Sequence, residues 1–181
     1  MRLSLLSIAL LISTAAHAQT MLGTVTSDLD QNGTAEVFTL IDSGQGYATL
    51  EIENTAKGLL KSHDIAWVGG MDGQIPYLAL APNGSVQVIS INDSVGRDRW
   101  QLTLTIAYRD NDYRVAGYTY EWNDTLDLAS NGICDVNILA GKGETSLNGG
   151  PNTSFATDEF ATPVTDWSDS SFGPNEACFP Q

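Results

Sequence analysis

The feature that most constrains the fold is a run of alternating apolar residues that predicts one long β-hairpin. Between Trp100 and Tyr108 every second residue is large and apolar, namely Leu102, Leu104, Ile106 and Tyr108. Residues 109–112 form a polar turn, and residues 113–122 return with apolar side chains on both faces. A repeat of two fits a strand, whose side chains alternate between faces, and does not fit a helix. We therefore expect a sheet with one buried face.

Shorter apolar segments predict further strands separated by glycine- and asparagine-rich turns. The expected strands are residues 36–41, 47–52, 77–80, 85–91 and 133–139, with a last edge strand at residues 162–167. Residues 55–61 are the one segment expected to form a short helix. From about residue 141 the chain is rich in Gly, Asn, Ser, Thr and Pro, which predicts a loop-rich C-terminal part.

Together these segments predict an all-β fold. Seven or eight short antiparallel strands joined by hairpins, with little helix, suggest two packed sheets arranged like a sandwich. Residues 19–181 are long enough for a single domain with one core.

The first 18 residues predict a secretory signal peptide. Arg2 provides the positive start, residues 3–12 are mostly apolar, and Ala16-His17-Ala18 matches the small residues of a cleavage site. A membrane anchor is the alternative, but spanning a bilayer takes about twenty apolar residues. We expect cleavage before Gln19, export to the periplasm or the extracellular space, and no membrane insertion afterwards.

The charge of the chain restricts its partners. Removal of residues 1–18 leaves seven basic and 22 acidic residues, a net charge of −15. Such a charge argues against nucleic acid and anionic membrane surfaces as partners. It is compatible with cation binding, and it is also sufficient to keep an exported protein soluble.

The two cysteines, Cys134 and Cys178, are expected to form a disulfide in an oxidising compartment. The bridge would close a loop of about 45 residues, for which the chain-entropy relation gives about 4 kcal/mol of stability. A catalytic thiol is the alternative, but it needs a nearby base, and His63 is the one histidine after residue 18.

An acidic loop is the most informative segment for function. Asp28, Asp30, Asn32 and Glu36 occupy positions 1, 3, 5 and 9 of the loop, and Gly33 permits a sharp turn. Calcium takes six to eight hard oxygen ligands, usually several carboxylates and a backbone carbonyl, which Thr34 would supply. The loop is not an EF-hand, because position 12 is Thr39 and a strand follows directly. The alternative is a solvated turn in which Asp and Asn cap backbone groups.

Residues 25–40, which contain this loop, resemble a single VCBS or FG-GAP repeat. The resemblance implies a structural calcium ion that orders a β-hairpin, held by Asp28, Asp30, Asn32, Thr34 and Glu36. Asn32 and Glu36 stand where the family often has Asp, and the lower charge at Asn32 is expected to weaken binding. A propeller built from such repeats needs at least four blades, whereas this chain has one copy.

Further segments are similar to a group of exported bacterial proteins, and this similarity implies export and a β-fold without an activity. They are residues 67–70, 96–100 and 104–120.

Other candidate sites rest on weaker patterns. A second acidic stretch has a spacing that fits no compact ion loop; its residues are Asp124, Asp127, Asn131, Asp135 and Asn137. His63 lies between Ser62 and Asp64, but no nucleophile-elbow pattern is present. Asp110 and Asp112 could form a glycosidase pair, although a hairpin turn also favours Asp.

Many large aromatic residues are expected mainly in the core. They are Trp67, Trp100, Trp122, Trp167, Tyr108, Tyr113, Tyr118 and Tyr120. Two or three of them exposed on one face would form a platform for a sugar or a protein.

The sequence thus predicts an exported, calcium-stabilised, non-enzymatic β-domain that binds or adheres to a protein or glycan. A carbohydrate-binding module or an envelope hydrolase with a carboxylate site is the alternative.

Overall fold

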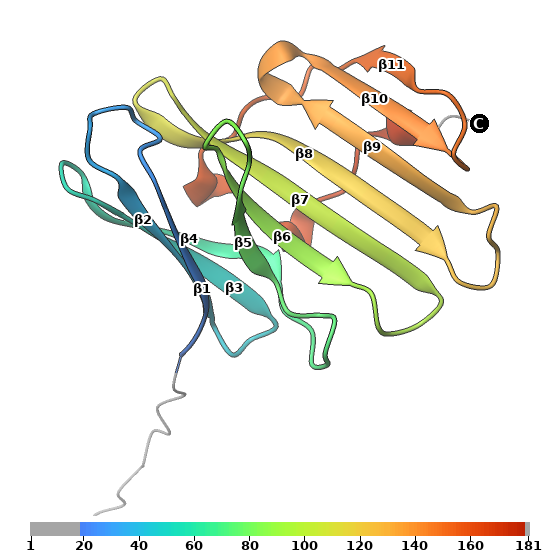
Figure 1. Ribbon diagram of the computed structural model, residues 1–181, viewed down its shortest axis with the longest axis horizontal. Helices are drawn as coiled ribbons and strands as arrows, with labels where there is room; N and C mark the ends of the chain where they lie inside the picture. The colour runs from blue at the N-terminus through green and yellow to red at the C-terminus, as the bar shows by residue number, and fades with distance from the viewer. Residues whose placement is uncertain (1–18, 180–181) are drawn as a thin grey trace, which may run out of the picture.

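The protein is built from two antiparallel β-sheets that pack face to face (Figure 1). The computed structural model describes residues 19–179, so the predicted signal peptide lies outside the described residues. The smaller sheet has strands in the order β1-β2-β3-β4. Their bounds are β1 Thr20–Ser27, β2 Glu36–Asp42, β3 Tyr47–Asn54 and β4 Gly58–Trp67.

The larger sheet contains seven strands in the order β11-β10-β9-β8-β7-β6-β5. Their bounds are β5 Tyr77–Leu80, β6 Val86–Asn92, β7 Asp98–Arg109, β8 Asp112–Asp124, β9 Asn131–Asn137, β10 Lys142–Leu147 and β11 Thr153–Ala156. In both sheets, strands that follow one another in the chain are neighbours in space. The predicted all-β fold of two packed antiparallel sheets is therefore confirmed.

The long hairpin predicted from residues 100–122 is the centre of the larger sheet. Trp100 pairs with Trp122, and Tyr108 pairs with Tyr113. The connection between β7 and β8 is the two-residue turn Asp110-Asn111, in which both residues have positive φ, at 53° and 62°. Such a turn matches the natural twist of a hairpin.

The core lies between the two sheets. The small sheet contributes fully buried residues such as Phe38, Leu40 and Leu50, which belong to one cluster with Leu104 and Ile106 of β7. The period-two pattern of β7 thus faces inward, because burial of its apolar face provides most of the stability of the sandwich.

The helix expected at residues 55–61 is wrong. Thr55, Ala56 and Lys57 form a tight turn, and β4 begins at Gly58, whose φ is 80°. The side-chain oxygen of Asn54 accepts hydrogen bonds from the backbone N–H groups of Ala56 and Lys57, at 2.8 and 2.9 Å. This capped turn reverses the chain, so the residues that follow pair with β3 instead of forming a helix.

The C-terminal part contains more regular structure than the composition suggested. β10 and β11 lie beyond residue 141, and eleven strands replace the seven or eight expected. The strand expected at residues 133–139 ends at Asn137, which caps the short 3-10 helix η1 (Ile138–Ala140). The edge strand expected at residues 162–167 is also wrong, because Val164–Asp166 form the 3-10 helix η2.

After η2 the chain crosses the inner face of the larger sheet as two more 3-10 turns, η3 (Asp169–Ser171) and η4 (Glu176–Cys178), drawn in orange-red in Figure 1. The backbone N–H of Asn175 donates to the Tyr118 hydroxyl at 2.9 Å. The Phe179 ring packs on Trp122, with 4.9 Å between the ring centroids. We name residues 164–179 the C-terminal strap.

The predicted disulfide between Cys134 of β9 and Cys178 of η4 is confirmed, with 5.4 Å between the Cα atoms. Both cysteines are fully buried. The bridge therefore fixes the end of the strap to the larger sheet. Within residues 19–179, no helix is both long enough and apolar enough to cross a membrane.

Candidate metal centre

The acidic loop predicted to bind calcium connects β1 to β2. One carboxylate oxygen from each of Asp28, Asp30 and Glu36 lies within 4.8 Å of the others. Glu36 is the first residue of β2, whereas the two aspartates lie in the irregular segment after β1. The structure therefore brings together three of the five predicted ligands, namely the three carboxylates.

Hydrogen bonds to the two aspartates shape the turn. Both oxygens of Asp28 accept from the backbone, one from Asn32 N–H and one from Gly33 N–H, each at 3.0 Å. Asp30 Oδ1 accepts from the same Asn32 N–H at 3.1 Å. Gly33 has a φ of 88°, which favours glycine and explains the residue at this position.

The other two predicted ligands, Asn32 and Thr34, lie at the exposed tip of the turn. Asn32 Oδ1 accepts from Thr34 N–H at 2.8 Å, and its Nδ2 donates to Asp30 Oδ2 at 2.8 Å. The amide nitrogen of Asn32 therefore contacts Asp30, whereas its amide oxygen accepts from the backbone and keeps a second lone pair.

Glu36 differs from the aspartates because its side chain is buried, with 1% of the residue exposed. Its Oε2 accepts from Leu29 N–H at 2.8 Å, and its Oε1 accepts from Asn54 Nδ2 at 3.2 Å. None of the three ion pairs found in residues 19–179 involves Asp28, Asp30 or Glu36. A buried carboxylate without a cationic partner is unfavourable unless another positive charge is supplied.

Asn54 is the functional residue that sequence reasoning missed. It is buried at the end of β3, and its Nδ2 lies 2.9 Å from Asp30 Oδ2 and 2.7 Å from the Tyr113 hydroxyl, besides the contact with Glu36. Tyr113 belongs to β8, so this amide connects the acidic loop to the larger sheet. No pattern in the sequence marks it, because Asn before a turn is common.

The surroundings of the loop change the pKa of two of its groups. Partial burial raises the pKa of Asp30, but hydrogen bonds from Asn54 and from the Asn32 backbone outweigh burial and leave this pKa below its usual value. Burial raises the pKa of Tyr113 far above its usual range, and the negative charge of Glu36 adds to the rise. Asp30 is therefore ionised and Tyr113 is neutral at physiological pH.

The donor set fits a hard divalent cation. The converging groups are the three carboxylates of Asp28, Asp30 and Glu36, and the set contains neither thiolate nor imidazole. Oxygen-only ligands favour calcium or magnesium over zinc and copper. Both Asp28 oxygens and Asp30 Oδ1 accept one hydrogen bond each and keep a lone pair for a cation, whereas Asp30 Oδ2 already accepts from two amides.

The second acidic stretch does not converge. Asp124 forms an ion pair with Arg97, which lowers the pKa of Asp124, whereas Asp135 accepts from the Thr119 hydroxyl at 2.7 Å. Asp127 donates its backbone N–H to Asp124 Oδ1 at 3.2 Å, and its side chain accepts from Ala129 N–H. Within residues 19–179, no second group of three acidic, histidine or cysteine ligands comes together.

His63 has one side-chain partner, the Thr49 hydroxyl, 3.4 Å from its Nδ1. No carboxylate of the described chain hydrogen-bonds to its ring, and the nearby Glu51 is paired with Lys61. Asp110 lies in the β7–β8 turn, 3.9 Å from Arg114, and Asp112 is the first residue of β8, where its side chain accepts from Tyr113 N–H. Both patterns are thus accounted for by local structure.

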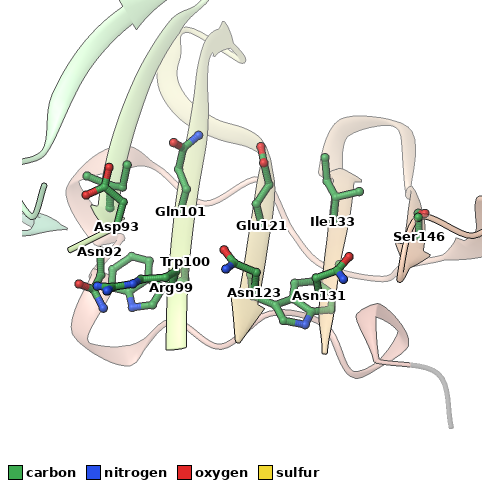
Figure 2. Close-up of a pocket in the computed structure, with 14 residues that line it drawn as sticks. Asn92, Asp93, Arg99, Trp100, Gln101, Glu121, Asn123, Asn131, Ile133 and Ser146 are labelled. Atoms are coloured by element: carbon green, nitrogen blue, oxygen red, sulfur yellow. The ribbon is translucent and has the colours of Figure 1, made fainter. Parts of the chain in front are cut away.

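A shallow hollow of about 570 Å³ lies on the outer face of the larger sheet. Figure 2 shows Gln101, Glu121, Ile133 and Ser146 side by side on adjacent strands. The acidic side chains that line this hollow are Asp93 and Glu121, and Gln101 stands between them in Figure 2. The lining of the hollow thus combines these polar side chains with the apolar Ile91, Trp100, Trp122 and Ile133.

None of the eight aromatic residues considered for an exposed platform is fully exposed. Tyr113 and Tyr118 are buried, and the other six are partly covered. Trp67, Trp100 and Tyr120 instead line a cavity between the sheets and the C-terminal strap, together with Tyr47 and Phe172. Sequence reasoning missed the last two residues, because a period of two does not indicate which rings meet across sheets.

Comparison of the chain with protein-family models, with curated proteins and with solved structures finds no match. The resemblance of residues 25–40 to a calcium-loop repeat therefore stays a prediction.

Proposed function

We propose that this chain is an exported, calcium-stabilised β-domain with a non-enzymatic role in binding or adhesion. One observation carries the calcium assignment: the buried carboxylate of Glu36 lies within 4.8 Å of Asp28 and Asp30 without a cationic partner in the described chain. A solvated turn would account for the aspartates, but it would not account for a buried third carboxylate beside them.

Electrostatic repulsion supports the need for a cation. At 4.8 Å and an effective dielectric constant of about 20, two like charges repel by roughly 3.5 kcal/mol. Solvent reduces this value for the exposed Asp28. A divalent ion bound by Asp28, Asp30, Asn32, Glu36 and the Thr34 carbonyl would convert repulsion into attraction and would hold the β1–β2 connection in place.

The site suits a compartment rich in calcium. The neutral Asn32 lowers the charge of the ligand set, and extracellular modules bind calcium with dissociation constants of about 10⁻⁴–10⁻³ M. The disulfide is compatible with the oxidising compartment that export would provide. Through Asn54, the ion would also stabilise the contact between the two sheets.

Calorimetric titration of metal-free residues 19–181 with calcium tests the site. We expect one ion per chain, and we expect Asp30→Asn to abolish the heat of binding. Asp72→Asn is the matched control, because Asp72 is an exposed loop aspartate outside the cluster. Absence of binding to the wild-type chain, or equal binding by both variants, would rule out the assignment.

Two further experiments test the remaining parts of the proposal. N-terminal sequencing of the exported protein is expected to begin at Gln19. A screen of glycans and envelope proteins with residues 19–181 is expected to identify a ligand that remains unmodified after incubation. A ligand that is cleaved during incubation would instead support the hydrolase alternative.

A further inference from the structure

A pocket of about 270 Å³, open to solvent and called the aromatic cavity below, lies between the two sheets and the C-terminal strap. Its aromatic lining comes from four strands and the strap: Tyr47 of β3, Trp67 of β4, Trp100 of β7, Tyr120 of β8 and Phe172. The Trp67 and Trp100 rings lie 5.5 Å apart between centroids, inclined by 48°. Segments that are distant in the sequence thus contribute five aromatic residues to the lining of one small space.

One acidic side chain, Asp169 of η3, also lines this cavity. Its polar neighbours are the Ser90 hydroxyl, 3.5 Å from Oδ2, and the backbone N–H of Trp67. No Lys or Arg lines the cavity, and none of the ion pairs in the described chain includes Asp169. Asp169 therefore lines an aromatic cavity, and its carboxylate has no countercharge in the described chain.

The charge state of Asp169 suits a positively charged ligand. Burial raises the pKa of Asp169 to about 6, so the group is ionised above neutral pH although its surroundings disfavour the charge. The other titratable groups at the cavity are the hydroxyls of Tyr47 and Tyr120, and the charge of Asp98 acts on Tyr120. A bound cation would relieve the unfavourable charge of the carboxylate.

We propose that this cavity binds a small organic ammonium ion, such as a methylated amine. The faces of Trp and Tyr rings attract ammonium groups, and methylation gives such a group an apolar surface that fits an aromatic lining. The carboxylate of Asp169 supplies the opposite charge. The volume is slightly below the range of about 300–1,000 Å³ found for drug-sized ligands, which favours a ligand of a few carbon atoms.

A neutral sugar fits this lining less well. Sugar hydroxyl groups need several hydrogen-bonding partners, whereas the polar side chains at the cavity are Asp169, Ser170 and the two tyrosine hydroxyls. Aromatic rings from several directions also suit a compact cation better than they suit the flat face of a sugar ring.

This site does not depend on the calcium proposal. Tyr47 begins β3 and Asn54 ends it, so the cavity and the acidic loop lie at opposite ends of a strand about 23 Å long. The disulfide at Cys178 fixes the strap that carries Asp169 and Phe172. The cavity is therefore preformed by covalent and packing constraints of the fold, and not by the metal.

Titration with choline chloride, followed by tryptophan fluorescence and calorimetry, tests the proposal on residues 19–181. The neutral isostere 3,3-dimethylbutan-1-ol is the matched ligand control, and sodium chloride controls for ionic strength. We expect choline to bind at least about tenfold more tightly than the isostere. Equal affinity for the two compounds, or no choline binding beyond the salt control, would overturn the proposal.

Variants test the role of each part of the cavity. Asp169→Asn is expected to weaken choline binding by about tenfold or more. The matched control is Asp166→Asn, at an exposed residue of the same strap, and we expect it to leave choline binding unchanged. Phe172→Leu keeps an apolar side chain but removes one ring, and we expect a loss of about threefold. Unchanged choline affinity in Asp169→Asn would refute a cation site. A monosaccharide that binds the Asp169→Asn and Asp166→Asn variants with equal affinity would also refute it.

Discussion

Replacement of Glu36 by Gln provides the sharpest test of the acidic loop. The substitution removes one negative charge from the cluster and preserves the size and one oxygen of the side chain. Because Glu36 is buried and accepts two hydrogen bonds, a purely structural role predicts a stability difference from wild type that is the same with and without calcium. A role as a metal ligand predicts a loss that depends on calcium.

The magnitude follows from two opposing contributions in the absence of metal. Relief of repulsion from Asp28 and Asp30 is worth about 1–2 kcal/mol, once solvent screening reduces the roughly 3.5 kcal/mol for each pair at 4.8 Å. Gln keeps one acceptor oxygen, so it weakens one of the two hydrogen bonds that Glu36 accepts and loses the other, at a combined cost of about 2 kcal/mol. We therefore expect the free energies of unfolding of Glu36→Gln and wild type to agree within about 1 kcal/mol in chelator.

Calcium is expected to separate the two proteins. At a calcium concentration one hundred times the dissociation constant, the bound ion adds about 2.7 kcal/mol to the wild type. For a domain of this size, that gain raises the melting temperature by about 5–10 °C. The variant is expected to gain little, since it lacks the buried carboxylate.

Thermal melts followed by circular dichroism, in chelator and in excess calcium, measure both quantities. In chelator we expect similar melting curves for the two proteins. In excess calcium we expect the melting temperature of the wild type alone to rise. The reasoning fails if Glu36→Gln is less stable by 3 kcal/mol or more in both conditions, or if both proteins respond equally to calcium.

Three further predictions concern other parts of the fold. Replacement of Cys134 and Cys178 by Ser is expected to lower stability by about 4 kcal/mol, measured by urea unfolding, because the bridge closes 44 residues; a loss below about 1 kcal/mol would contradict this. Asn54→Ala removes a buried donor shared by three acceptors and should cost about 1–3 kcal/mol, whereas the exposed neighbour variant Glu53→Ala should cost little. Asp169→Asn should be more stable than wild type by up to about 3 kcal/mol near pH 7.5, with the difference vanishing toward pH 4.

The sign of the last prediction follows from the raised pKa of Asp169. The folded pKa, about 6, exceeds the usual value of 3.8, so between these values the folded state binds more protons than the unfolded state. The wild type therefore loses stability as pH rises through this window, and the neutral Asn avoids that loss. A difference between the two proteins that does not change with pH would show that the carboxyl group titrates normally.

Local features of the sequence determined much of this molecule. The alternation of Leu102, Leu104 and Ile106 predicted a strand, because side-chain direction along an extended chain follows from backbone geometry alone. The presence of two cysteines left one possible pair. The spacing of the acidic loop placed Asp28, Asp30 and Glu36 together, because a tight turn brings alternate residues to one side.

The strands missed by sequence reasoning lack this local signal. β10 and β11 contain Gly, Ser and Thr at positions where an apolar residue would be expected. Gly143 is buried because the Phe155 ring occupies the space of its missing side chain, 2.4 Å from where a Cβ would lie. Such a strand is stabilised by its neighbours, so its own composition does not predict it.

Only the tertiary structure decided how distant residues combine. Asn54 became part of the acidic loop because β3 lies beside β2 and β8 crosses above it, which places the amide between Asp30 and Tyr113. The aromatic cavity exists because the strap carries Asp169 and Phe172 over Trp67 and Trp100. These contacts join residues far apart in the chain, and their free energy depends on the packing of both sheets, which no local pattern encodes.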